Sequence, residues 1–161
     1  MTVSSQESHQ ESDRASPLLR QSIEALNAEF AWLIDHRNGA GVAELFTSDG
    51  VYDMANQVYS GRGQIAQFYE TRKARGRRAA RHVFTNLHLT PEGPDRAAGT
   101  VILTLYAYDG EPPYPAAAIL IADYNDIYVR DRNGRWRYRS RTIVPVFGGV
   151  PNLAGPAAKP A

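Results

Sequence analysis

The chain has 161 residues, of which 43% are hydrophobic and 22% charged, and its formal net charge is +1. This composition is typical of one globular domain with a sizeable core. The near-neutral charge excludes a global field that would attract nucleic acid or an anionic membrane. Cysteine is absent, which excludes disulfides, thiolate nucleophiles and zinc–thiolate sites. The polar N-terminus and the lack of a long apolar run predict a cytoplasmic protein without a membrane span.

The first structured element predicted from the sequence is a long helix. Residues 1–16 are polar and are expected to form a flexible N-terminal tail. The helix is predicted to begin at Pro17 behind the N-cap Ser16 and to end near Arg37, before Asn38 and Gly39. Its main apolar stripe recurs at steps of three and four residues, as expected for a helix. The stripe consists of Leu19, Ile23, Leu26, Phe30, Leu33 and Ile34.

A second, narrower stripe runs along the opposite side of this helix. It contains Ala25, Ala28 and Trp32 and ends at Asp35. A helix that is apolar on two faces is predicted to lie between two layers, so we expect Asp35 to be covered. The alternative is a local contact with Arg37 or with solvent. A negative charge is unfavourable at the C-terminal end of a helix dipole, which favours a specific role for Asp35.

The segment after the helix is predicted to contain several short elements. The arginine-rich loop among them could steer an anionic substrate, but it lacks the interleaved aromatic residues of a nucleic-acid surface. These elements are a short helix at 42–46, a turn at 47–50, a hairpin of 51–54 with 58–59, a third helix at 63–71 and a solvated loop at 72–78.

The remainder of the chain has the pattern of strands. Four segments rich in β-branched and aromatic residues are separated by clear turns, including Asn133-Gly134. Helices followed by consecutive antiparallel strands predict an α+β fold rather than a parallel sheet. Residues 148–161 are expected to form an extended C-terminal tail. The predicted strands are 81–89, 99–108, 116–130 and 135–146.

Six short segments, taken together and in this order, resemble the SnoaL-like branch of the nuclear transport factor 2-like superfamily across residues 17–147. The resemblance implies a curved antiparallel sheet that forms a conical barrel closed by the N-terminal helices, a cystatin-like architecture. It also implies a homodimer formed through the outer sheet surface. The segments are LIDHRN (33–38), AELFTSDGVYD (43–53), SGRGQI (60–65), RHVFTN (81–86), YND (124–126) and GRWRY (134–138), followed by Arg141.

The resemblance also implies a catalytic pair. Scytalone dehydratase, hexachlorocyclohexane dehydrochlorinase and bile-acid dehydratase carry an Asp near the end of the first helix and a His on the strand matched here by RHVFTN. Asp35 and His82 fall on these positions, so His82 would take a proton while Asp35 orients the imidazole. Those enzymes place tyrosines near the leaving group. Here Tyr52 and Tyr69 are the candidate replacements, and Trp32 occupies a pocket-side position.

Further binding residues follow from strand alternation. His82, Phe84, Asn86 and His88 alternate on one face, so Phe84 and Asn86 are expected to line the cavity. For His82, the alternative is a histidine that is simply hydrogen-bonded in the core. The four histidines have no metal-ligand spacing, and we expect neither a metal nor a cofactor.

Asp126 and Arg141 are expected to pair across adjacent strands. This pair is either a salt bridge within the sheet or part of an oxyanion site. An epoxide-opening hydrolase of a related fold uses an Asp–Arg–Asp arrangement, which Asp123 or Asp126 could form with Arg141.

The favoured hypothesis is a cofactor-independent acid–base enzyme of the dehydratase, isomerase or cyclase type. Its substrate would be a hydrophobic cyclic small molecule, with no nucleic-acid or membrane partner. One alternative is a non-catalytic small-molecule-binding or accessory module of the same fold, and a further alternative is the epoxide-opening hydrolase.

Overall fold

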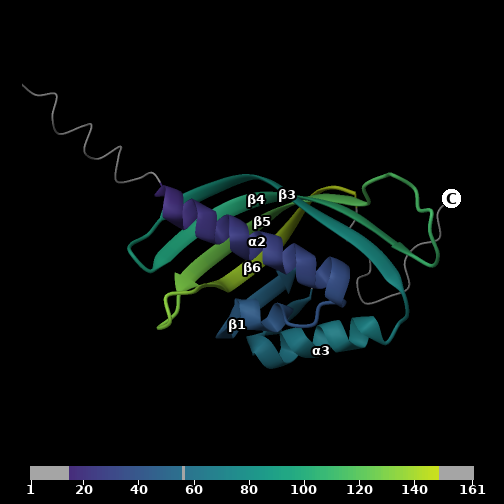
Figure 1. The fold of residues 1–161 in the computed structure, drawn as a ribbon, viewed down its shortest axis with the longest axis horizontal. Coiled ribbons are helices and arrows are strands. Elements are labelled where there is room, and N and C mark those ends of the chain that lie inside the picture. Colours follow the sequence, from purple (N-terminus) through teal and green to yellow (C-terminus); the bar gives the residue numbers. More distant parts are fainter. Residues whose placement is uncertain (1–14, 56, 149–161) are drawn as a thin grey trace, which may run out of the picture.

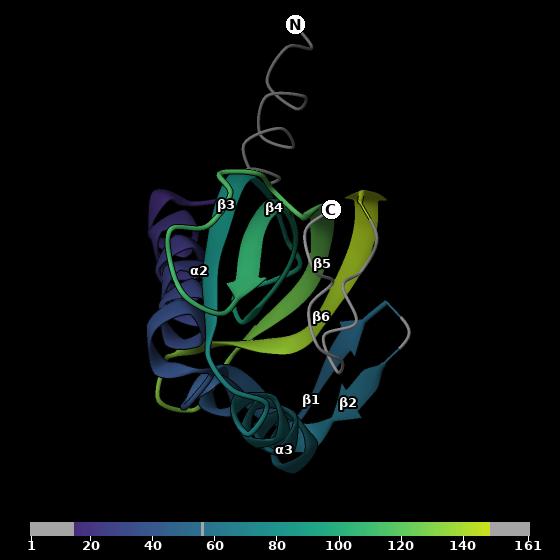
Figure 2. The same cartoon turned by 90° about the vertical axis from the view of Figure 1, so that its right-hand side faces the viewer.

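A curved sheet of six strands packs against helix α2 (Pro17–Arg37), while helix α3 (Gly61–Lys73) lies beside strand β1 (Phe46–Met54) (Figure 1). The structure is a computed structural model that describes residues 15–55 and 57–148. The strand order is β2-β1-β6-β5-β4-β3. Figure 2 shows the sheet bending from β3, beside α2, to β1 and β2, beside α3. The predicted α+β class with a curved sheet is confirmed.

Helix α2 begins and ends as predicted. The Ser16 Oγ accepts a hydrogen bond from the Leu19 N–H at 3.2 Å, and Asn38 adopts a left-handed conformation with φ of 53° after the last turn. The main stripe is buried against the sheet, including Ile23 and Phe30, each with 0% exposure. Because this face packs against the sheet, the rotation of the helix about its axis is fixed, and with it the direction in which the side chains of its C-terminal turn point.

The prediction that a second layer covers the opposite stripe of α2 is wrong within the described part of the chain. Ala25 and Ala28 are exposed, and 55% of Trp32 is accessible to solvent. Alanine methyl groups bury little apolar area, so leaving them in water costs little. Asp35 is nevertheless covered, because strand β3 packs against the end of the helix.

The short elements after α2 are close to those predicted. A 3₁₀ helix, η1, spans Val42–Leu45, and β1 pairs with β2 (Val58–Ser60) as an antiparallel hairpin. The expected turn at 47–50 is instead an irregular part of β1, where the register with β6 shifts between Phe46 and Val51. Strand β1 lies parallel to β6, so the sheet is mixed rather than wholly antiparallel.

Four long antiparallel strands form the rest of the sheet, as predicted. Helix α3 extends to Lys73 and β3 already begins at Arg78, so the solvated loop expected at 72–78 is shorter than predicted. Strand β5 begins at Leu120, four residues after the predicted start at residue 116. The bounds are β3 (Arg78–Pro91), β4 (Arg96–Asp109), β5 (Leu120–Arg130) and β6 (Trp136–Phe147).

A β-bulge interrupts β3. Asn86 has a positive φ of 54°, and the pairing with β4 shifts between Thr85 and His88. The extra residue reverses the alternation, so His82 is on the inner face but Asn86 and His88 are exposed. The bulge therefore leaves Asn86 exposed, so Asn86 does not line an enclosed cavity with His82 as expected.

The core fills the space between α2, α3 and the concave face of the sheet. Among the described residues, no helix has both the length and the apolarity needed to cross a membrane. The tails expected at 1–16 and 148–161 lie almost entirely outside the described residues, which begin at Ala15 and end at Gly148.

Candidate active site

The end of helix α2 and the start of strand β3 are joined by a pair of hydrogen bonds between Asp35 and His82. Asp35 Oδ2 accepts from the backbone N–H of His82 at 2.9 Å, and Asp35 Oδ1 lies 2.6 Å from His82 Nδ1. Only 6% of the Asp35 side chain and 10% of the His82 side chain are exposed. Two contacts from one carboxylate fix both the backbone position and the ring orientation of His82.

These contacts determine which ring nitrogen of His82 is available. An ionised carboxylate can only accept, so Nδ1 carries a proton and donates it to Asp35. In the neutral ring Nε2 then keeps its lone pair. No described residue forms a hydrogen bond with Nε2, and His82 lines a pocket. The arrangement can accept a proton at Nε2 while Asp35 stabilises the resulting imidazolium.

The pocket is a cavity of about 80 Å³ inside the curved sheet. It lies between the last turn of α2, the helix α3 and strands β1, β3 and β4. Most of its wall is apolar or aromatic, which suits a small hydrophobic ligand. The lining residues are Ile34, Asn38, Tyr52, Met54, Phe68, Tyr69, Arg72, Lys73, Gly76, Arg78, Ala80, His82, Leu105 and Ala107.

The two tyrosines proposed from sequence, Tyr52 and Tyr69, both lie in this wall and are buried. Burial raises the pKa of each phenol well above its usual range, so both remain protonated hydrogen-bond donors at neutral pH. Gly39 makes room for Tyr69, because a Cβ at this position would lie 2.0 Å from the Tyr69 Cδ1. Its φ of +81° also requires glycine.

Sequence reasoning missed the basic part of the pocket wall. Arg72 and Arg78 were assigned to a solvated loop, but their side chains are only 16% and 10% exposed. Both line the pocket, together with Lys73. The signal lay in the alternation of Arg78, Ala80 and His82, because all three share the inner face once β3 begins at Arg78.

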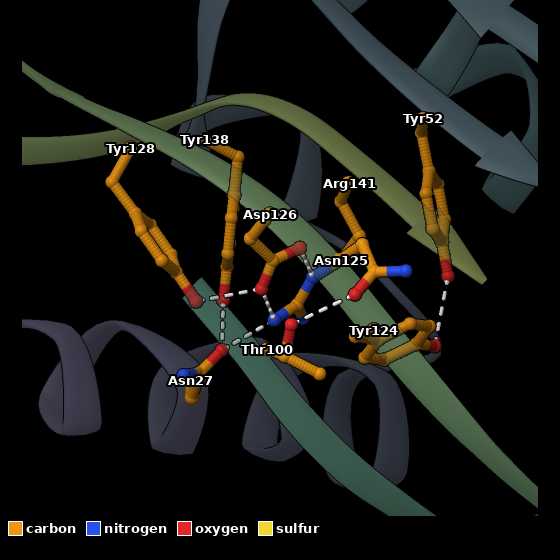
Figure 3. Close-up of polar contacts among 9 residues, drawn as sticks. All are labelled: Asn27, Tyr52, Thr100, Tyr124, Asn125, Asp126, Tyr128, Tyr138 and Arg141. Atoms are coloured by element: carbon orange, nitrogen blue, oxygen red, sulfur yellow. Dashed lines mark hydrogen bonds and ion pairs between the residues drawn. The ribbon is translucent and has the colours of Figure 1, made fainter. Parts of the chain in front are cut away.

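Arg141 and Asp126 form a second buried ion pair (Figure 3), and neither residue lines the pocket. Arg141 Nε donates to Asp126 Oδ1 at 2.9 Å and Nη2 donates to Oδ2 at 2.7 Å, while both side chains are 0% exposed. The Oδ1 of Asn27 accepts from Arg141 Nη2 and from the hydroxyl of Tyr138. The hydroxyl of Tyr128 donates to Asp126 at 2.6 Å.

Aromatic rings enclose the guanidinium of Arg141. Its central carbon lies 4.1 Å from the ring centre of Tyr138, 4.3 Å from that of Tyr124 and 4.4 Å from that of Phe30. Phe84 lies in the same shell at 5.2 Å. Burial alone would lower the pKa of Arg141. Asp126 and the nearby tyrosines raise it by more than burial lowers it, so the pKa lies well above the usual range.

This sealed arrangement corrects three predicted binding residues. None of the three lines this pocket: Arg141 and Asp126 are fully buried in their own pair, and Phe84 belongs to the aromatic shell and lines a second, open depression together with His82. The predicted cross-strand pairing is present in the register Asp126↔Arg141. The salt-bridge alternative therefore describes this pair better than the oxyanion site.

Two other predicted binding residues also lie elsewhere. The rings of Trp32 and His36 are tilted to each other with centres 4.0 Å apart, and Trp32 lines an open depression beside the α2–β3 contact that Asp35 and His82 also line. Asn86, at the bulge, lines the same depression. Asp123 is on the opposite face of β5 from Asp126, so the structure does not assemble the Asp–Arg–Asp arrangement of the epoxide-hydrolase alternative.

Comparison with known proteins identifies the family and supports the fold. A family model described as a SnoaL-like domain matches residues 17–142. ActVI-ORFA from Streptomyces coelicolor has a similar structure, with a TM-score of 0.69 and 20% identity over 79% of this chain and 97% of that chain. A protein from Novosphingobium aromaticivorans, provisionally named a scytalone dehydratase, gives a TM-score of 0.68 and 20% identity over 80% of this chain and 84% of that chain.

The same fold occurs in a subunit of a larger assembly. The β subunit of a provisionally named aromatic-ring-hydroxylating dioxygenase from N. aromaticivorans gives a TM-score of 0.71 and 15% identity, over 86% of this chain and 95% of that chain. Among proteins with curated functions, no significant relative is found. Because the family model covers most of the chain, this protein belongs to the SnoaL-like domain family, within the nuclear transport factor 2-like superfamily.

Proposed function

We propose that this protein is a cofactor-independent acid–base enzyme of the dehydratase, isomerase or cyclase type, acting on a hydrophobic cyclic small molecule. The observation that carries the proposal is the double contact from Asp35 to His82, which leaves Nε2 of a pocket-lining imidazole without a hydrogen-bond partner among residues 15–55 and 57–148. The provisional name of the scytalone dehydratase of similar fold supports the same class of chemistry.

In the proposed reaction, His82 Nε2 removes a proton from the carbon beside a carbonyl group. The electron pair of the broken C–H bond moves onto the carbonyl oxygen or expels a leaving group from the neighbouring carbon. Asp35 stabilises the imidazolium, and the protonated hydroxyl of Tyr52 or Tyr69 donates to the developing oxyanion. A positioned base of this kind accelerates such a step by about 10²–10⁴-fold.

Hydrogen exchange tests this step without knowledge of the natural substrate. Cyclohexanone and α-tetralone are incubated with the protein in deuterated water, and proton NMR follows deuterium incorporation beside the carbonyl. We expect incorporation above the buffer rate, and we expect His82→Gln to abolish the excess. His88→Gln is the matched control, because His88 is exposed on the same strand.

The non-catalytic binding module makes the opposite prediction. Ligands would bind in the pocket, but the protein would not accelerate exchange in any compound of the panel. That result would contradict the enzyme proposal and favour the binding module.

We further propose a homodimer formed through the outer face of the sheet. Val144 and Val146 project from this face of β6 and are 42% and 54% exposed. Sedimentation equilibrium of the wild type should give twice the monomer mass. The double variant Val144→Lys, Val146→Lys should give the mass of a monomer. A monomeric wild-type protein would contradict this proposal.

A further inference from the structure

The basic end of the pocket points to the charge of the ligand. We propose that the pocket binds a small ring compound through a carboxylate group, which Arg78 and Arg72 hold at the end of the cavity away from His82. This inference names the substrate class for the proposed acid–base site and therefore rests on that proposal.

The charges along the pocket wall favour an anion. The lining includes three cationic side chains, Arg72, Lys73 and Arg78, and it contains no carboxylate. The carboxylate of Asp109 approaches from behind, 3.3 Å from Arg72 Nη2 and 4.0 Å from Arg78 Nε. The three cationic side chains and Asp109 together carry a net charge of +2, so this end of the pocket stays positive and favours an anionic group.

Arg78 lines the pocket with two terminal nitrogens that lack hydrogen-bond partners among the described residues. Its side chain is only 10% exposed, and both nitrogens, Nη1 and Nη2, are buried. Burial lowers the pKa of the Arg78 guanidinium, and neighbouring Arg72 lowers it further. Buried guanidinium N–H groups without acceptors are costly. A carboxylate ligand would supply two acceptors in the geometry that a guanidinium prefers.

The spacing along β3 fits a ligand with two ends. Arg78 and His82 lie on the same face of the strand, four residues or about 13 Å apart along the backbone. Ala80 lies between them, paired with Ala107 of β4, and Leu105 pairs with His82. Ala80, Leu105 and Ala107 form an apolar patch of the pocket wall, which we call the floor. A ring would rest on the floor, with its carboxylate at Arg78 and its reacting carbon near His82.

Paired probes test the charge preference. Benzoate and benzamide have nearly the same shape but differ in charge, and their binding can be compared by isothermal titration calorimetry and by NMR shifts of Arg78 and Ala80. We expect the wild type to bind benzoate about tenfold or more tightly than benzamide. The preference should weaken as salt concentration rises.

Matched arginine variants locate the effect. Arg78→Gln should remove most of the preference for benzoate, and Arg72→Gln should reduce it. Arg77→Gln should leave it unchanged, because Arg77 is exposed, pairs with Glu111 and does not line the pocket. Arg78→Gln should melt at the same or a higher temperature than the wild type, because it removes a buried charge that lacks hydrogen-bond partners. A lower melting temperature would assign Arg78 a structural role and contradict the inference.

The inference and the proposed function can fail separately. Equal affinity for the two probes, absence of benzoate binding, or a preference that survives Arg78→Gln would overturn the anion site. If the ketones still exchange deuterium through His82 in that case, the acid–base proposal stands. If benzoate binds through Arg78 but His82 supports no exchange, the anion site stands and the acid–base proposal falls.

Discussion

Asp126 and Asp35 each bind a basic side chain inside this fold. The two pairs differ in whether a nitrogen of the basic side chain still faces a ligand pocket. Asp126 binds Arg141 within a shell of aromatic rings, and both side chains are 0% exposed. Asp35 binds one nitrogen of His82, while the other lies in a pocket wall and has no hydrogen-bond partner in the described part of the chain. We therefore assign a structural role to the first pair and propose a catalytic role for the second. The comparison shows that burial of a charged pair does not by itself identify an active site.

The largest expected effect is loss of stability at alkaline pH. Burial raises the pKa of five tyrosines of the core most strongly, so the folded state retains protons that the unfolded chain releases near pH 10. Their stabilisation is complete below pH 10 and is lost as pH rises above it, by about 1.4 kcal/mol per pH unit for each phenol. The five are Tyr52, Tyr69, Tyr124, Tyr128 and Tyr138.

Urea denaturation at pH 8 and above pH 10, together with tyrosinate absorbance, measures this effect. We expect the absorbance of these phenols to appear only as the protein unfolds. Their ionisation in a protein that stays fully folded would contradict the sealed character of the aromatic shell.

Breaking the sealed pair should be the next largest effect. Arg141→Met leaves the Asp126 carboxylate buried without its cation, which costs about 3–5 kcal/mol of unfolding free energy. Urea denaturation near pH 7 measures the loss. A change below about 1 kcal/mol, the value typical of an exposed pair, would show that the interior is open to water there.

Asp35→Asn should cost less stability but should change function. The single oxygen of an asparagine can accept from the backbone N–H or from Nδ1 of His82, so one of the two hydrogen bonds is lost. We expect the unfolding free energy to fall by about 1–2 kcal/mol. Deuterium exchange should slow, because an amide does not enforce the tautomer with a free Nε2. Thermal unfolding and the ketone assay measure the two effects. A stability loss as large as that of Arg141→Met, with unchanged exchange, would reverse our assignment of the two pairs.

Trp32→Ala should have the smallest effect. Trp32 is 55% exposed and lies outside the pocket, so its replacement should change the unfolding free energy by no more than about 0.5 kcal/mol. Exchange of the ketones should stay at the wild-type rate. A strong loss of exchange would place the reacting ligand in the open depression rather than in the inner pocket.

The local patterns of the sequence predicted much of the fold. The spacing of apolar residues and the cap at Ser16 gave α2 its limits, and β-branched and aromatic runs separated by turns gave the four long strands. Asp35 and His82 were brought together by resemblance to a family, since neither periodicity nor spacing could show which strand passes the end of α2.

Other features depended on tertiary structure. The bulge at Asn86 reverses the alternation of β3, and nothing in its immediate sequence distinguishes it from a continuous strand. Arg78 resembles a loop residue because it follows a run of cationic side chains, yet pairing with Asp109 of β4 makes it the first residue of β3. Arg141 is buried because rings from α2, β3, β5 and β6 meet around it, which no single segment reveals.

The most direct test of the central claim is the rate of deuterium exchange in cyclohexanone and α-tetralone, measured for the wild type and His82→Gln when both are shown to be folded. We predict that the wild type accelerates exchange and that His82→Gln lowers this rate by about 10²–10⁴-fold, without a comparable loss of stability. Equal rates in the two proteins would contradict the assignment of His82 and Asp35 as the acid–base site.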